Sequence, residues 1–161
     1  MSLDTLSDLF EEQLKDLYNA ENQLTKALPK MAKKASSPML KKAFQDHLAE
    51  TQVHIERLKQ IADELEIKPT GKTCKAMKGL IEEGAEVIEE DGEDSVIDAA
   101  LVAAAQRVEH YEISAYGTMC ALGEALGHKN AVKILRKTEE EESAADEKLT
   151  QICESELYAT V

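Results

Sequence analysis

The sequence is poor in aromatic residues, and this shortage bears on the fold class. It has no tryptophan, two phenylalanines and four tyrosines, so aromatic residues make up only 4% of its 161 residues. Strands favour aromatic and β-branched side chains, which argues against a β-sandwich. The chain is instead 43% hydrophobic and 32% charged, a balance typical of helices built from alanine, leucine, glutamate and lysine. We therefore expect an all-α protein.

Cysteine is scarce as well, and its spacing excludes two further classes. Cys74, Cys120 and Cys153 are far apart, odd in number and form no Cys-x-x-Cys pair. A disulfide framework and a zinc-binding motif both need closer or paired cysteines. Reduced thiols fit this pattern best, and we expect a cytoplasmic protein.

Long apolar runs and basic clusters are also missing. No stretch approaches the roughly 20 apolar residues that span a bilayer, and the N-terminus lacks the basic and apolar regions of a signal peptide. The formal charge of −13 would repel nucleic acid and anionic lipid. We expect neither as a partner. A negative net charge favours cations as binding partners, although the commoner reason for such a charge is an acidic surface that keeps the protein soluble.

Apolar residues recur at intervals of three and four in four long stretches, the period of an amphipathic helix. The predicted helices run from Leu3 toward Lys34, from Pro38 to near Ile67, from after Asp91–Asp94 to about Leu126, and onward from just after Gly127.

The connections between these helices indicate how they are arranged. The first two and the last two are joined by short turns, which make antiparallel hairpins, whereas residues 68–93 form a long crossover with a short helix between Met77 and Ile88. One long crossover distinguishes ferritin-like bundles from simple up-and-down bundles. We expect one ferritin-like four-helix domain over residues 1–161.

An internal repeat relates the two hairpins. A shift of 91 residues places the apolar positions of the first hairpin on those of the second without gaps, and it also places Glu21 on Glu112 and Glu50 on Glu141. Glu21 and Glu112 occupy positions where the helical pattern expects leucine, so they should point inward. Residues equally far from a tight turn lie level, so each hairpin presents two carboxylates at one height.

Four ionised carboxylates in one core need a compensating cation, because an unpaired buried charge is strongly penalised. Bundle proteins that hold two iron or manganese ions use glutamates from all four helices together with histidines. His54, one turn beyond Glu50, and Glu109, one turn before Glu112, are candidates to complete such a site. The predicted ligands of two Fe or Mn ions are Glu21, Glu50, His54, Glu109, Glu112 and Glu141.

Several alternatives remain open at this stage. Glu142 lies nearer the strict apolar stripe than Glu141, and a run of acids is usually a solvated face. His47 could be a ligand, although a supporting or core histidine is the favoured interpretation, and His110 is expected at the surface. Arg107 could pair with the inward glutamates. The tyrosines near the site are expected to be core groups with one hydrogen bond each, namely Tyr18, Tyr111 and Tyr116.

Several blocks of the sequence, matched in order and spacing, resemble the YciE/YciF family of small ferritin-like proteins. They are LYNAENQLTKALPKMA, HLAETQVHIERL, AAAQRVEHYEISAYGT, EEEESAADEKL and the crossover segment KGLIEEGAEVI. The resemblance implies a rubrerythrin-like bundle, often dimeric, that is associated with bacterial stress responses and has no established reaction. This chain departs from the usual ferritin-like signature, in which Glu and His are three residues apart. Here Glu50 and His54 are four residues apart, and no histidine follows Glu141.

Two functions of different classes follow. The first is a di-metal protein that oxidises ferrous iron or reduces peroxide, for which the expected partner is a small oxidant, peroxide or oxygen, that accepts the electrons, with no catalytic residue assigned. The alternative is a non-enzymatic stress-response or interaction protein with a vestigial or structural metal site.

Overall fold

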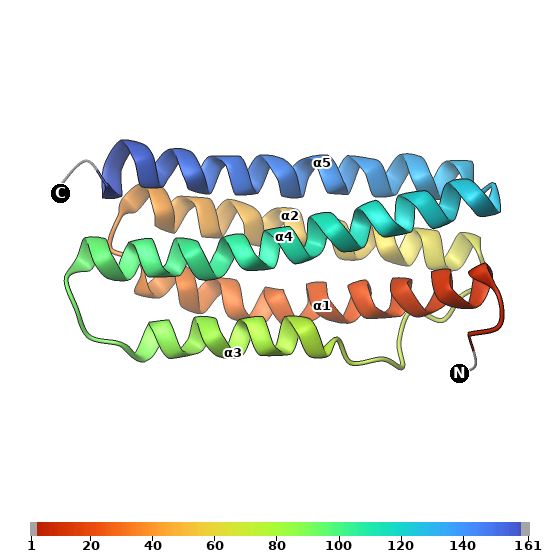
Figure 1. Cartoon of the computed structure of the whole chain (residues 1–161), viewed down its shortest axis with the longest axis horizontal. Coiled ribbons are helices and arrows are strands. Elements are labelled where there is room, and N and C mark those ends of the chain that lie inside the picture. The colour runs from red at the N-terminus through yellow and green to blue at the C-terminus, as the bar shows by residue number, and fades with distance from the viewer. Residues whose placement is uncertain (1–2, 159–161) are drawn as a thin grey trace.

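The computed structural model describes residues 3–158, and within that range it is entirely helical, with no strand. Four long helices run side by side, and α3 lies along α1 and α4 (Figure 1). The elements are α1 (Leu6–Lys34), α2 (Pro38–Glu64), α3 (Lys75–Glu89), α4 (Asp94–Leu126), α5 (Lys129–Ile152) and a π-helical turn (Cys153–Leu157) that continues α5. The predicted all-α class and the helix in the crossover are confirmed.

The helix ends follow from capping residues. Thr5 and Asp8 form a capping box that starts α1 three residues later than the expected Leu3, because each side chain bonds the backbone of the other. Ser37 caps α2 ahead of Pro38, whose missing N–H costs nothing in a first turn. Gly127 ends α4 with φ of 76°, a left-handed conformation that glycine adopts without strain.

The second hairpin is packed most closely at its turn. A Cβ atom added at Gly123 of α4 would lie 2.7 Å from Cγ2 of Val132 in α5, which is closer than real Cβ contacts. A larger residue there would push the two helices apart. Gly123 therefore lets α4 and α5 approach each other just before Gly127 turns the chain.

The apolar interior consists of two clusters. Along each long helix the buried apolar residues are interrupted near the middle, so that one cluster fills each end of the bundle. The apolar pairs related by the 91-residue shift are all buried, as predicted: Leu14 and Ala105, Leu17 and Val108, Leu28 and Met119, Phe44 and Leu135, Leu58 and Leu149, Ile61 and Ile152. What separates the clusters is a layer of buried polar side chains.

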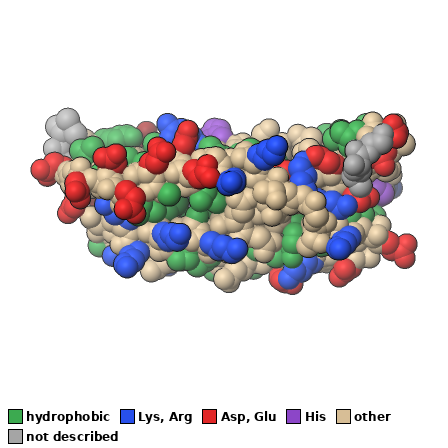
Figure 2. All heavy atoms as spheres, turned by 90° about the horizontal axis from the view of Figure 1, so that it is seen from below, with side chains coloured by type: hydrophobic (Ala, Val, Ile, Leu, Met, Phe, Trp, Pro, Cys, Tyr) green, Lys and Arg blue, Asp and Glu red, His purple; other side chains and the backbone are tan. Residues whose placement is uncertain are grey.

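The surface is charged and mixed in sign. The face viewed from the α3 side carries both acidic and basic side chains (Figure 2). Within residues 3–158, no helix combines the length and the apolar character that crossing a membrane requires.

Candidate metal centre

The polar layer contains eight buried side chains, contributed by all four long helices. Each of these residues is at most 5% exposed: Glu21, His47, Thr51, His54, Glu109, Glu112, Thr138 and Glu142. They lie between leucine, valine, alanine and phenylalanine neighbours that belong to the two apolar clusters. Carboxylates and imidazoles are rarely buried so deeply unless they are paired or bind a metal.

The helical period explains why these residues point inward. In α2 the buried stripe runs through Phe44, His47, Thr51, His54 and Leu58, at steps of three and four. In α5 the corresponding stripe runs through Leu135, Thr138, Glu142 and Leu149. Each polar residue of the layer therefore occupies a position where the same helix would otherwise present an apolar side chain.

Glu142 lies at the centre of the layer, and its two oxygens face different histidines. Oε1 is 2.9 Å from Nδ1 of His54, and Oε2 is 3.6 Å from Nε2 of His47. Two groups of ligand atoms, each within 4.8 Å of one another, share this residue. One group is Glu21, His54 and Glu142, and the other is His47, Glu109, Glu112 and Glu142. Glu142 is thus the one residue that belongs to both groups that could hold a metal ion.

Many polar atoms of the layer have no hydrogen-bond partner. Both carboxylate oxygens of Glu112 are unpaired, as are both oxygens of Glu142, both ring nitrogens of His47, and one oxygen each of Glu21 and Glu109. The short distances around Glu142 do not have hydrogen-bond geometry. A buried polar atom without a partner is costly, and a divalent cation would pair with several of these atoms at once. The donor set therefore fits metal ions.

Electrostatics in the layer reflects crowded negative charge. Burial raises the pKa of Glu21 and raises that of Glu109 and Glu112 well above the usual range, and repulsion from Glu142 adds to each shift. Burial also opposes ionisation of Glu142, but its contact with His54 and the charge of His47 lower its pKa. Without metal, Glu142 is therefore the carboxylate most ready to ionise.

The histidines respond in the opposite direction. Burial alone would lower their pKa values, but the charge of Glu109 and contact with Glu50 raise the pKa of His47 to about 9. Contacts with Glu142 and Glu21 raise the pKa of His54 to about 10. A metal ion would have to displace these protons, because imidazole binds metal in its neutral form.

Glu21, His54, Glu109 and Glu112, four of the six residues predicted as ligands, lie together in this layer. Tyr116 adds a contact, since its hydroxyl donates a hydrogen bond of 2.5 Å to Oε1 of Glu21. This matches the expectation of a buried phenol with one hydrogen bond.

Glu141 does not point into the layer, so its expected inward placement is wrong. Its carboxylate accepts bonds from both terminal nitrogens of Arg57, at 2.5 and 3.0 Å, and Oε2 is 3.0 Å from Nε2 of His54. The neighbouring Glu142 is fully buried instead. Height alone cannot separate these residues, because one step along a helix turns the side chain by about 100°. Glu141 instead orients the outer nitrogen of His54.

Glu50, predicted as a metal ligand, also lies outside the layer, because the residue next to it in α2 takes the inward position. Its side chain is 49% exposed and lies at the edge of the layer, with Oε2 at 3.4 Å from Nδ1 of His47. Thr51, one residue later, takes the buried position. Glu50 and Glu141 are thus the two predicted ligands that neither ligand group contains.

His47, for which a supporting or core histidine is the favoured interpretation, lies in one of the two ligand groups. As a core histidine it should have a hydrogen-bond partner, yet neither ring nitrogen has one, and Nε2 faces Glu109 at 3.3 Å. The spacing of residues 44, 47, 51, 54 and 58 indicates in the sequence that His47 lies on the buried face of α2. His110, by contrast, lies at the surface as expected and contacts Asp146 at 3.3 Å.

Fold and site together define an all-helical protein with a central layer of histidine and glutamate that could hold metal ions. The family model described as "Domain of unknown function (DUF892)" matches residues 5–161. The protein YciF of Escherichia coli (strain K12) is 50% identical over 153 residues, which cover 94% of this chain and 92% of YciF. The chain therefore belongs to the DUF892 family, and its resemblance to the YciE/YciF proteins is confirmed.

Solved structures agree with this assignment. The crystal structure of the E. coli stress protein YciF matches with a TM-score of 0.90 over 92% of this chain and 94% of that chain. YcfI from Rhodopseudomonas palustris, described as a candidate structural protein, matches with a TM-score of 0.89 at 47% identity over 92% of this chain and 95% of its own. A protein from Xanthomonas campestris pv. campestris shares the fold at 18% identity, with a TM-score of 0.77 over 97% of this chain and 96% of that chain.

Proposed function

We propose that this chain forms one ferritin-like domain that binds a dinuclear iron or manganese centre in its polar layer. The observation that carries the proposal is the position of Glu142 between two groups of buried ligands, combined with the unpaired oxygens of Glu112. Buried carboxylates that repel one another are stable as anions only with cations beside them.

Each metal position would have its own ligands. Glu21 and His54 would hold one ion, His47, Glu109 and Glu112 would hold the other, and Glu142 would bridge them. Carboxylate oxygens with one imidazole at each position suit iron and manganese better than metals that prefer thiolates. None of the three cysteines belongs to either ligand group.

The surrounding residues prepare the site for redox chemistry. A bound pair of iron or manganese ions would supply the redox chemistry, in which ferrous iron gives up electrons and peroxide or oxygen accepts them. Glu141, held by Arg57, fixes the ring of His54 through Nε2 and leaves Nδ1 facing Glu21 and Glu142. Tyr116 holds one oxygen of Glu21 and keeps a proton beside the layer. The apolar clusters on both sides exclude bulk water.

A stress role is the physiological context that we propose. The protein YciF of E. coli, which is 50% identical, is described as a stress protein. Removal of peroxide or of ferrous iron would protect a cell under oxidative stress, and both are reactions of the proposed centre. We therefore propose an oxidoreductase of the ferroxidase or peroxidase type.

Metal analysis tests the binding proposal. Protein produced in iron-rich and in manganese-rich medium should contain about two ions per chain, as expected for a bundle site of this type. The double variant Glu21→Ala with Glu112→Ala should lose them, whereas Glu140→Gln, an acidic residue exposed on α5, should keep them. Wild-type protein without metal under both conditions would refute the proposal.

The second candidate is a non-enzymatic interaction protein with a structural metal site. The description of YcfI as a candidate structural protein favours it, and so does the incomplete symmetry of the two hairpins, in which Thr51 corresponds to Glu142 and Ala145 to His54. Rapid mixing with Fe(II) and peroxide separates the two functions. Turnover well above that of free metal, absent in the double variant, would support the enzyme, and no turnover by metal-loaded protein would support the interaction protein.

A further inference from the structure

A pocket of about 140 Å³ between α2 and α5 reaches the polar layer from the side of the bundle. Two buried residues of the layer, His47 and Glu109, form part of its wall. Neither ring nitrogen of His47 has a hydrogen-bond partner, and Oε2 of Glu109 has none. The pocket thus extends from the surface to two residues that carry unpaired ligand atoms.

Small side chains leave this opening. Ala144 and Ala145 line the pocket on the α5 side. Under the 91-residue shift, Ala145 corresponds to His54, which is fully buried in the first hairpin. Because Ala145 is smaller than a histidine, it leaves space in the wall of the pocket that an imidazole ring would fill.

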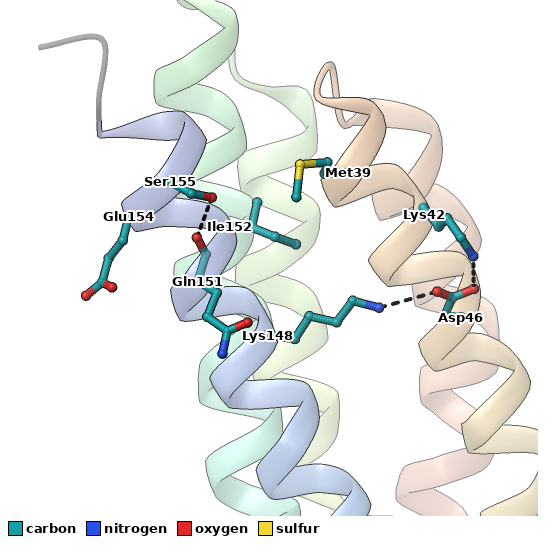
Figure 3. Close-up of a pocket in the computed structure, with 8 residues that line it drawn as sticks. All are labelled: Met39, Lys42, Asp46, Lys148, Gln151, Ile152, Glu154 and Ser155. Carbon is teal, nitrogen blue, oxygen red and sulfur yellow. Dashed lines mark hydrogen bonds and ion pairs between the residues drawn. The ribbon is translucent and has the colours of Figure 1, made fainter.

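The rim of the pocket is mainly acidic. Asp46, Glu50 and Glu141 line it, and Lys148 is the basic side chain of the wall. Lys148 is paired with Asp46 at 3.3 Å, and Asp46 is also paired with Lys42 at 2.7 Å (Figure 3). Glu141 is held by Arg57. Glu50 is the carboxylate that combines substantial exposure with a contact to His47.

An open groove of about 710 Å³ adjoins this pocket and shares Asp46 and Lys148 with it. Figure 3 shows Lys148 of α5 extending across this groove to Asp46 of α2, with Met39 and Ile152 facing each other. Solvent therefore reaches the rim of the inner pocket. The apolar clusters cover the layer toward both ends of the bundle, whereas the pocket between α2 and α5 reaches it from the side.

We infer that divalent metal ions reach the centre through the pocket between α2 and α5, with Glu50 as the first carboxylate to bind them and His47 and Glu109 next. This inference rests on the proposed metal site and adds its loading route. The exposure of Glu50 suits this function. A carboxylate that is half exposed to solvent can bind a hydrated ion and release it again, whereas Glu142 is fully buried. Negative charge at a rim also raises the local concentration of cations.

Stopped-flow mixing of the metal-free protein with Co(II), followed by its absorption, tests the route. The rate reports access, and the final amplitude reports the number of sites. Ala145→Leu should load about tenfold more slowly by narrowing the pocket, and Glu50→Gln should load several-fold more slowly, both with unchanged final amplitude. Ala121→Leu, at an exposed position of α4 outside the pocket, and Glu140→Gln are the matched controls and should load at the wild-type rate.

The outcomes separate this inference from the proposed function. Loading of both Ala145→Leu and Glu50→Gln at the wild-type rate would overturn the route while leaving the metal site intact. Wild-type protein that binds no Co(II), Fe(II) or Mn(II) would overturn the site and the route together. Circular dichroism shows whether Ala145→Leu folds, and Glu50→Gln carries the test if that variant does not. Slowing of the Glu50→Gln reaction that disappears at high salt would support electrostatic attraction at the rim.

Discussion

The two hairpins have the same apolar framework but contribute different chemistry to the layer between them. Hairpin α1–α2 supplies Glu21 and both histidines, and hairpin α4–α5 supplies three of the four buried carboxylates. Glu21 and Glu112 correspond under the 91-residue shift, whereas the other positions differ. The pairs that differ are Tyr18 and Glu109, His47 and Thr138, Thr51 and Glu142, and His54 and Ala145.

The two hairpins therefore share a symmetric apolar framework, while the side chains that could bind metal are divided unequally between them. Ferritin-like di-metal proteins carry Glu-x-x-His on two helices. Here α2 has Thr51-x-x-His54 and α5 has Glu142-x-x-Ala145, so each helix retains one half of the pattern. His47 and Glu109 would add ligands at positions that the symmetric pattern leaves unused. Neither hairpin alone offers a complete site, and the metals would join the two.

The largest expected effect comes from Glu142, the residue shared by both ligand groups. Glu142→Gln should lower the affinity for both metal ions by more than about 100-fold, because a neutral amide cannot bridge two cations, and even outer-shell changes cost 10–100-fold. Titration with Mn(II) at pH 7 measures this. Glu140→Gln, with the same change on the surface of α5, should bind as wild type. Retention of two tightly bound ions by Glu142→Gln would show that the two positions do not depend on a shared carboxylate.

Making the hairpins more alike should destabilise the metal-free protein. Thr51→Glu adds a fifth buried carboxylate to the polar layer, which should lower the free energy of unfolding by about 3–5 kcal/mol, and Mn(II) should restore part of the loss. Thr51→Val is the control, since the Thr51 hydroxyl has no hydrogen-bond partner and its removal should change stability by less than about 1 kcal/mol. Urea unfolding with chelator and with Mn(II) measures both. Equal stability of Thr51→Glu and Thr51→Val without metal would contradict the account.

Stability of the metal-free protein should fall as the pH rises. His47 and His54 have pKa values raised to about 9 and 10, so their stabilisation is complete below the unfolded value of 6.5 and disappears as the pH rises through 9 to 10. The raised pKa values of Glu109 and Glu112 act in the same direction above about pH 4.5. Thermal unfolding in chelator should show a Tm lower by at least about 5 °C at pH 9.5 than at pH 6.5.

Metal-loaded protein is the control for this pH series. Metal affinity should increase with pH, because fewer protons have to be displaced, so the loaded protein should keep its Tm over the same range. A metal-free Tm that rises with pH would mean that the histidines are not held as cations by the carboxylates.

The smallest effect should come from Glu141, which supports His54 without facing the layer. Glu141→Gln removes the charge that holds Nε2 of His54 and should weaken metal binding roughly tenfold, less than the loss expected for Glu142→Gln. The ion pair with Arg57 is partly exposed, so its loss should reduce stability by no more than about 1 kcal/mol. A tenfold larger loss for Glu141→Gln than for Glu142→Gln in the same titration would reverse the proposed roles.

The fold could be predicted largely from the sequence because periodicity and turn residues act locally. Pro38 and Gly127 punctuate the hairpins, and the expected ends lie within about three residues of those observed, as with Leu6 and Glu64. The inward positions of Glu21 and Glu112 followed from the same pattern. Capping residues set the exact helix ends. Thr5 and Asp8 start α1 through side-chain hydrogen bonds, which the spacing of apolar residues does not predict.

The site was less predictable because two adjacent residues of the same type differ only in rotation about the helix. Glu141 and Glu142 lie at nearly the same height, and so do Glu50 and Thr51. The 91-residue repeat pairs Glu50 with Glu141, although the stripe of α2 runs through Thr51. The role of His47 is hard to predict from the sequence, because an inward histidine usually finds a partner in a core. Its environment depends on Glu109 and Glu142, which reach it from other helices.

Anomalous scattering at the iron and manganese edges, from crystals of protein loaded with each metal, tests the central claim most directly. The account predicts two peaks on opposite sides of the Glu142 carboxylate, one beside Glu21 and His54 and one beside His47, Glu109 and Glu112. No peak in the layer, or peaks only at surface carboxylates such as Glu50, would contradict it.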